Sequence, residues 1–331
     1  MTDAPASPAP TSPADTGPYA VPVAEVVRSG FVESVHHGVV VALDADGSVL
    51  LERGNPSAPI FPRSAVKPIQ AVAMLRHGLD LDGELLALVS SSHSGEAFHL
   101  DGARRILAAA GLSESDLQNT PGLPIDPVER DAWVAAGRPA SSIAADCSGK
   151  HAGMLSTCVA AGWDLATYRD PRHPLQQAIA ESLTELAGEP ISATGVDGCG
   201  APVFAVPLTG LARAFGRLAT AAIGTPEGRV RDAIRAHPQW LGGTRRDVTT
   251  LIRGVDGLVS KDGAEAVQAV GLADGRCLAV KILDGGSRAR AVVTASALRA
   301  LGLDDDVLST MQSAPVLGHG EPVGAVTATG F

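Results

Sequence analysis

Lysine is rare in this chain, and three of its four lysines stand in short polar motifs. Of the 26 basic residues only four are lysines, and Lys67, Lys150 and Lys261 lie in the segments S-A-V-K, C-S-G-K-H and V-S-K-D-G. Arginine keeps its proton in a protein, whereas a buried lysine can lose its proton and act as a neutral amine base. The placement of these lysines therefore indicates base chemistry. A GC-rich genome would also lower the lysine count, but it does not account for the placement.

Ser64 and Lys67 have the spacing of a helical serine–lysine pair. Residues three apart share one face of a helix, so the Lys67 amine can reach the Ser64 hydroxyl and take its proton. A serine needs such a base because its hydroxyl is a weak nucleophile. Bringing a lysine pKa from about 10.4 toward 7 disfavours the charged form by roughly 4 kcal/mol, which burial and a second cation can supply. We expect Lys261 to be that cation.

Pro68 limits where this pair can lie. Proline lacks the N–H of a helical residue and disfavours helical geometry at the residue before it, so Ser64 must stand at the very start of the helix. There, free backbone N–H groups can hold an oxyanion. The S-x-x-K spacing alone is a weak signal, because it also occurs on surface helices.

Composition restricts the class of protein. With 331 residues, 45% of them hydrophobic and 19% charged, the chain is globular. A net charge of -10 without a basic run argues against nucleic acid as a partner. No apolar stretch is long enough to span a membrane. Residues 1–20 are rich in Ala, Pro, Ser and Thr and lack the features of a signal peptide, so we expect a disordered tail and a cytoplasmic protein.

The order of elements predicts an α/β fold. Valine-rich alternation predicts strands within 23–52, and further strand signals follow at 266–272 and 277–283. Apolar spacings of three and four predict helices between them and one after them, at 69–76, 97–110, 175–187, 206–222, 229–236 and 287–301. Residues 318–331 are expected to be an ordered loop or tail. We therefore predict one mixed sheet built from both chain ends and flanked by helices, as a single catalytic domain over residues 21–331.

Five motifs in fixed order resemble the L-asparaginase II family of the Rhizobium type. The most specific is C-S-G-K-H-A-G-M-L, and the resemblance extends over nearly all of the folded part of the chain. It implies a fold similar to serine β-lactamases and glutaminases, usually as a homodimer, and hydrolysis of L-asparagine to L-aspartate and ammonia. The motifs occupy residues 63–68, 88–96, 146–155, 196–199 and 261–263.

The resemblance also implies site residues. One catalytic pair would be Ser64 with Lys67, and the second would be Ser92 with Lys261. Ser92 and Lys261 could also have purely structural roles, since Ser92 could cap a helix and Lys261 could lie in an exposed turn.

A metal site is implied at Cys147, Lys150 and Cys199, with Asp197 beside it. Two thiolates and an amine would suit Zn²⁺ with water in a fourth position, although the chemistry requires no cofactor. A lysine ligand would have to lose its proton first. The alternative is that both thiols only line the pocket.

Four residues are candidates to bind the substrate. Asp197 could hold the α-amino group or orient Lys150, while Arg63 and Glu96 could meet the charged ends of the substrate. His93 is the fourth candidate; it could also act as a general base, a role that is less favoured because the lysines already fill it. Solvated-loop or helix-capping roles are the alternatives for these residues.

The predicted mechanism is an acyl-enzyme route in which Ser64 attacks the asparagine carboxamide and Lys67 takes its proton. Ser92 could be the nucleophile instead. One alternative is an acyltransferase of the β-lactamase or penicillin-binding type, but the chain has K-D-G in place of K-T-G and no S-x-N motif. The other alternative is a non-catalytic zinc-binding protein with the same fold.

Overall fold

The computed structural model describes residues 19–331, so nearly all of the predicted tail at residues 1–20 lies outside the described residues. The strands are β1 (Val21–Arg28), β2 (Phe31–Leu43), β3 (Val49–Arg53), β4 (Pro59–Ile60), β5 (Ala193–Val196), β6 (Pro202–Pro207), β7 (Val259–Gly263), β8 (Val267–Gly271), β9 (Cys277–Ile282), β10 (Ser313–Gly318) and β11 (Glu321–Ala328). The α-helices are α1 (Lys67–Arg76), α2 (Gly83–Val89), α3 (Ala97–Ala109), α4 (Pro127–Ala135), α5 (Ser148–Ala161), α6 (Pro174–Ala187), α7 (Leu208–Thr220), α8 (Pro226–Ala236), α9 (Pro238–Leu241), α10 (Asp247–Gly254), α11 (Arg290–Ala300) and α12 (Asp306–Met311). Three 3₁₀ turns are η1 (Arg63–Val66), η2 (Glu114–Asp116) and η3 (Ser287–Ala289).

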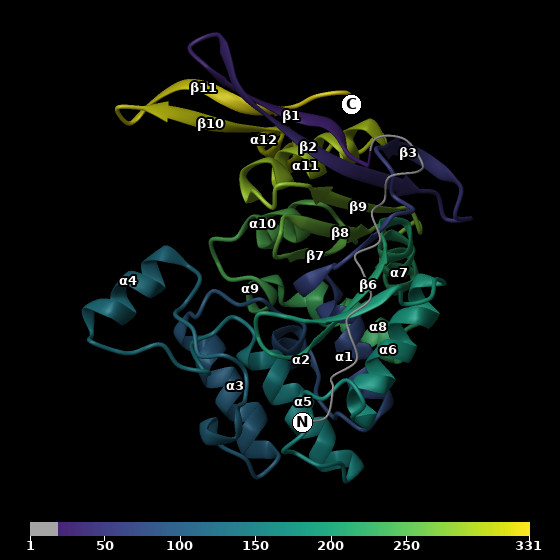
Figure 1. Ribbon diagram of the computed structural model, residues 1–331, viewed down its shortest axis with the longest axis vertical. Coiled ribbons are helices and arrows are strands. Elements are labelled where there is room, and N and C mark those ends of the chain that lie inside the picture. Colours follow the sequence, from purple (N-terminus) through teal and green to yellow (C-terminus); the bar gives the residue numbers. More distant parts are fainter. Residues whose placement is uncertain (1–18) are drawn as a thin grey trace, which may run out of the picture.

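The main sheet joins the two ends of the chain. Its strands run in the order β10-β11-β1-β2-β9-β8-β7, with β3 also paired to β2 (Figure 1). This confirms the predicted α/β class and the sheet built from both ends. The strand directions differ from the prediction, because the pairings within the described chain are antiparallel rather than mixed.

Helices cover the centre of the main sheet. Every residue of β8 is buried, and since successive side chains point to opposite faces, both faces must be covered. Helices α7 and α11 both pack against β8 and β9. The rest of the helical middle forms the lower part of the molecule in Figure 1, where α1, α2 and α5 pack together below β7. The edge strand β7 therefore faces the helical part, and the candidate site lies at this junction.

A second, three-stranded sheet in the order β4-β6-β5 interrupts the helical middle. The predicted helix at 206–222 is wrong at its start, because Val206 belongs to β6 and the helix begins at Leu208. Alanine-rich apolar spacing does not reveal this boundary. Pro207 marks it, since proline supplies no N–H to a helix and sits readily at its start.

The C-terminal segment forms a hairpin, which corrects the expected loop or tail at 318–331. Strands β10 and β11 are joined by His319 and Gly320, whose φ angles are 50° and 85°. Two successive positive φ angles are typical of a tight hairpin turn that suits the twist of the strands. Glycine and proline residues in β10 and β11 interrupt the alternating apolar pattern that would predict strands. Pairing of β11 with β1 stabilises the strand conformation instead.

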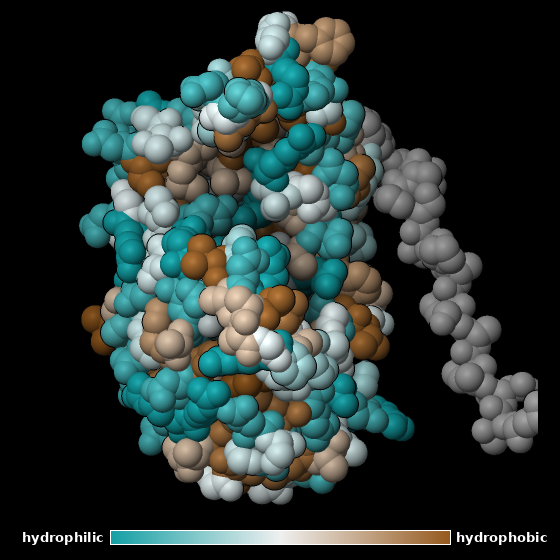
Figure 2. Space-filling view, turned by 90° about the vertical axis from the view of Figure 1, so that its left-hand side faces the viewer, coloured by the Kyte–Doolittle hydropathy of each residue, from teal (hydrophilic) through white to brown (hydrophobic). Residues whose placement is uncertain are grey.

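The face shown in Figure 2 carries small apolar patches separated by polar side chains. Single exposed apolar residues of this kind are usual on a globular surface. Within residues 19–331, no helix combines the length and apolar character needed to cross a bilayer.

Candidate active site

Ser64 lies in the 3₁₀ turn η1, and helix α1 begins only at Lys67. Pro68 therefore occupies the first turn of α1, where its missing N–H costs no helical hydrogen bond. This removes the conflict between Pro68 and the serine–lysine spacing. Arg63, directly before Ser64, has a φ of 52°, which is uncommon for a side-chain-bearing residue.

Strand β7 approaches this turn closely at Gly263. A Cβ atom at Gly263 would lie 2.7 Å from the Pro62 oxygen and 2.9 Å from the Ala65 nitrogen. Only glycine allows so short a separation between two main chains. The K-D-G motif thus brings Lys261, two residues earlier on β7, to the turn that carries Ser64.

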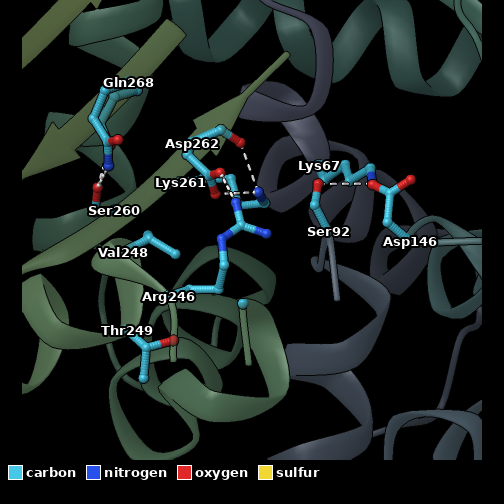
Figure 3. A network of polar contacts seen from close by, with 12 residues as sticks. Lys67, Ser92, Asp146, Arg246, Val248, Thr249, Ser260, Lys261, Asp262 and Gln268 are labelled. Carbon is cyan, nitrogen blue, oxygen red and sulfur yellow. Dashed lines mark hydrogen bonds and ion pairs between the residues drawn. The ribbon is translucent and has the colours of Figure 1, made fainter. Parts of the chain in front are cut away.

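Lys67 pairs with a different serine from the one predicted. Its Nζ donates a hydrogen bond of 3.0 Å to Ser92 Oγ and lies 3.4 Å from Asp146 Oδ2 (Figure 3). Ser64 Oγ has no hydrogen-bond partner among residues 19–331. Lys67 and Ser92 are both buried, with exposed fractions of 2% and 6%. Ser92 is therefore held in the interior.

Lys261 also differs from the predicted pairing, because its Nζ does not bond to Ser92. It donates to Asp262 twice, to the main-chain oxygen at 2.6 Å and to Oδ1 at 2.7 Å (Figure 3). Burial lowers the pKa of Lys261 to about 8; Asp262 opposes this shift, and the charge of Lys67 supports it. The expected second cation therefore lies close enough to Lys67 to feel its charge.

Two cavities meet at Ser64. The first, of about 320 Å³, is lined by Arg63, Lys67, Cys147, Asp197 and Cys199 among others. The second, of about 310 Å³, is lined by Ser92, Arg246, Asp262 and Arg290 among others. Ser64, Ile125, Asp146 and Ala264 line both. Ser64 therefore borders both cavities.

The predicted metal residues come together beside the first cavity. The start of α5 supplies Lys150, whose Nζ donates to Cys199 Sγ at 3.1 Å. The hydrogen bond between Cys147 and Cys199 raises the pKa of Cys147 and lowers that of Cys199, so Cys199 carries the negative charge. Burial lowers the pKa of Lys150, but both cysteines and Asp197 outweigh burial and hold it above its usual range. Lys150 is thus a cation next to a thiolate.

His151 completes this cluster and was not among the predicted ligands. The ligand atoms of Cys147, His151 and Cys199 lie within 4.8 Å of one another. His151 Nδ1 is bonded to the Tyr168 hydroxyl at 2.7 Å, while its buried Nε2 has no hydrogen-bond partner among the described residues. Burial, followed by the charge of Lys150, lowers the pKa of His151 to about 4. A buried imidazole nitrogen without another partner is a suitable metal donor, so His151 joins Cys147, Lys150 and Cys199 as a candidate ligand.

The four predicted substrate residues divide into two groups. Arg63 Nε donates to Asp197 Oδ1 at 2.7 Å, and both residues line the first cavity. His93 and Glu96 line neither cavity. His93 is buried between Ser148 Oγ at 2.8 Å and the Gly95 N–H at 3.2 Å, and Glu96 accepts hydrogen bonds from the Thr244 main chain and hydroxyl, both at 2.8 Å. His93 is thus bonded to the start of α5, and Glu96 to the segment at Thr244.

Sequence reasoning missed three further charged residues of the site: Asp146, Asp262 and Arg246. The first two lie within the motifs at 146–155 and 261–263, so their position next to Cys147 and Lys261 was an available signal. Arg246 pairs with Asp262 from a loop that carries no recognisable motif. Only the packing of α10 against β7 brings it to the site.

The site thus places a buried serine–lysine hydrogen bond beside a second serine that borders both cavities. The sequence model of the L-asparaginase II family matches residues 24–328, so the chain belongs to this family. Membership makes it an amidohydrolase-type enzyme. No curated protein matches the chain.

Several solved structures show a distant likeness. The structure described as Mglu is 15% identical, with a TM-score of 0.34, covering 80% of this chain and 67% of that one. EstCE1, described as a hydrolase with promiscuous acyltransferase activity, is 12% identical with a TM-score of 0.39, covering 76% and 90%. A putative beta-lactamase from Bacteroides dorei is 14% identical with a TM-score of 0.42, covering 79% and 93%. Likenesses at this level assign no substrate or mechanism to the chain.

Proposed function

We propose that the protein is an L-asparaginase that hydrolyses L-asparagine to L-aspartate and ammonia through an acyl-enzyme on Ser64. One observation carries this proposal: Ser64 lines both cavities, next to the Lys67–Ser92 hydrogen bond and the Arg63–Asp197 pair. Family membership supports the amide as the scissile bond. Ser92 is less suited to attack, since it is buried and lines only the second cavity.

The Arg63–Asp197 pair would bind the amino-acid end of the substrate. Arg63 uses Nε for Asp197, which leaves other guanidinium N–H groups to donate to an α-carboxylate. Asp197 accepts through Oδ1, which leaves Oδ2 for the α-ammonium group. The two side chains are 26% and 15% exposed, so a bound substrate can reach them. This clamp would orient the side-chain carboxamide toward Ser64.

The proton steps need a neutral amine. Lys67 first passes its proton to the neutral amine of Lys261, and it then takes the Ser64 proton as Oγ forms a bond to the carboxamide carbon. When the C–N bond breaks, the same proton passes to the leaving nitrogen, and ammonia departs. Water then attacks the β-aspartyl ester, gives a proton to Lys67, and the proton returns to Ser64 Oγ. N–H groups at the start of η1 would stabilise the oxyanion.

The thiol cluster would hold Zn²⁺, and its donor set supports this proposal. Cys147, Cys199 and His151 present two sulfur atoms and one nitrogen at mutual distances that a tetrahedral ion can bridge. Bound zinc would supply positive charge beside the first cavity. We also expect a homodimer, which light scattering of the purified protein would test.

A coupled ammonia assay with L-asparagine, L-glutamine and N-acetyl-L-asparagine tests the proposed function. We expect release from asparagine, none from the acetylated form that cannot meet Asp197 as a cation, and none from a Ser64→Ala variant. Mass spectrometry of quenched enzyme should place the aspartyl group on the peptide containing Ser64. A label on the Ser92 peptide would reverse the assignment of the nucleophile. Nitrocefin turnover without ammonia release would favour the acyltransferase alternative.

A further inference from the structure

Asp262 joins Lys261 to Arg246 in a buried network (Figure 3). Its Oδ1 accepts a hydrogen bond of 2.7 Å from Lys261 Nζ, and its Oδ2 pairs with Arg246 Nη2. Lys261 is fully buried and Asp262 is 5% exposed. One carboxylate is thus shared by two cations in the interior, where charges interact more strongly than in water.

This network borders the reacting groups. Arg246 and Asp262 line the second cavity together with Ser64 and Ser92. Lys261 stands two residues before Gly263, which touches the turn that carries Ser64. The network therefore adjoins the cavity in which proton transfer would occur.

We propose, building on the proposed function, that Asp262 and Arg246 are positioning residues: they hold the Lys261 amine and set how readily it exchanges a proton with the two serines. Asp262 anchors the amine through two hydrogen bonds. Arg246 competes for the same carboxylate and so weakens the hold of Asp262 on the charged form of Lys261. Neither residue contacts the substrate in this proposal.

The charges around Lys261 act in opposite directions. Burial lowers the pKa of Lys261 to about 8, Asp262 acts to raise it, and Lys67 and Arg246 act to lower it. Arg290 in α11 acts on Asp262, and Asp146 is the other carboxylate that senses Lys261. Removing the charge of Asp262 should therefore lower the pKa of Lys261, while removing the charge of Arg246 should raise it. A purely structural role would not produce opposite signs.

Arg245 provides a matched control. It directly precedes Arg246 and pairs with buried Asp126 through two hydrogen bonds, of 3.0 Å and 2.8 Å. Neither Arg245 nor Asp126 lines the two cavities that meet at Ser64. An Arg245→Gln variant thus disturbs the same loop and breaks a partly buried ion pair without touching Lys261.

The test is a pH titration of the full-length protein carrying ¹³Cε-labelled lysine, followed by NMR without substrate. With only four lysines in the chain, a Lys261→Arg variant identifies the Lys261 signal. Relative to wild type, we expect the midpoint to fall by about one pH unit in Asp262→Asn and to rise by about one unit in Arg246→Gln. Arg246→Lys and Arg245→Gln should titrate as wild type does. The acid limb of kcat/KM for asparagine should move with the midpoint in each variant.

Shifts of the same sign, or a Lys261 midpoint unchanged in both variants, would overturn the proposal. If Asp262→Asn does not fold, Arg246→Gln against Arg245→Gln still decides it. Opposite NMR shifts in a protein that releases no ammonia from asparagine would uphold the network and remove only the proposed substrate. A fall in kcat/KM that is equal at every pH, with no NMR shift, would show a structural role alone.

Discussion

Two walls of the active site each bury a lysine completely, yet the pKa values of the two lysines are shifted in opposite directions. On the thiol wall, formed by Cys147, Lys150 and Cys199, the pKa of Lys150 lies above its usual range. On the β7 wall, formed by Lys261, Asp262 and Arg246, the pKa of Lys261 falls to about 8. Burial favours the neutral amine in both.

The charged groups around each lysine account for the opposite pKa shifts of Lys150 and Lys261. Lys150 faces two anions, the thiolate of Cys199 and the carboxylate of Asp197, and Arg63 shares only the second of them. Lys261 has one carboxylate, which Arg246 shares, and Lys67 adds a second positive charge nearby. Burial alone therefore does not tell which lysine can act as a base. The ratio of anions to cations around the amine decides it.

The largest expected effect is a difference in kcat between variants of the two serines, Ser64 and Ser92. Ser64→Ala should lower kcat by about 10⁴-fold or more, because it removes the nucleophile. Ser92→Ala should lower kcat by about 10²-fold, because it removes only a hydrogen-bond partner of Lys67. Steady-state kinetics with asparagine measure both. A larger loss in Ser92→Ala than in Ser64→Ala would contradict the assignment.

The second-largest expected effect is a difference in kcat/KM between variants of Lys261 and Lys150, one lysine from each wall. Arginine keeps the positive charge but cannot become a neutral base. Lys261→Arg should therefore lower kcat/KM by about 10²-fold or more, whereas Lys150→Arg, which replaces a cation by a cation, should lower it by less than about 10-fold. Circular dichroism and thermal unfolding control for folding. Equal losses in the two variants would remove the distinction between the walls.

The pH dependence sharpens the same comparison. If the neutral amine of Lys261 is the active form, kcat/KM should rise with pH and level off above about 8, because the proton is lost near that pH. A pH–rate profile of the wild type measures this, and Lys281→Arg, at a lysine outside both cavities, should leave it unchanged. A profile already flat from pH 6 upward would be incompatible with a proton on Lys261 controlling the rate.

The smallest expected effect on activity concerns the thiol wall. A Cys147→Ala, Cys199→Ala double variant should lose bound zinc, because both sulfur ligands are gone. His151→Gln should weaken zinc binding, because it removes the nitrogen donor that lies within 4.8 Å of the two sulfur atoms. Metal analysis of chelator-free protein measures the content, with Cys158→Ala, a buried core thiol, as the control. Zinc retained in the double variant would exclude the site.

Much of the fold could be predicted from short-range pattern. The strands within 23–52 and the helices near 97–110 and 175–187 have strong periodicity, and glycines with positive φ follow their ends. The three-stranded inner sheet and the C-terminal hairpin could not be predicted in this way. Their short strands gain order from pairing with distant segments, such as β11 with β1, rather than from local propensity.

The sequence by itself determined which residues could do chemistry at the site, since Ser64, Lys67, Ser92 and Lys261 all stand in motifs. Only the tertiary structure decided how they pair. In the folded protein Lys67 donates a hydrogen bond to Ser92, and Lys261 donates one to Asp262. Arg246, which lies in a loop without a motif, also pairs with Asp262. The physical reason is that a pair at i and i+3 is only one option open to a long flexible side chain. The contacts available inside the folded protein select among these options, and hence set which amine can release its proton.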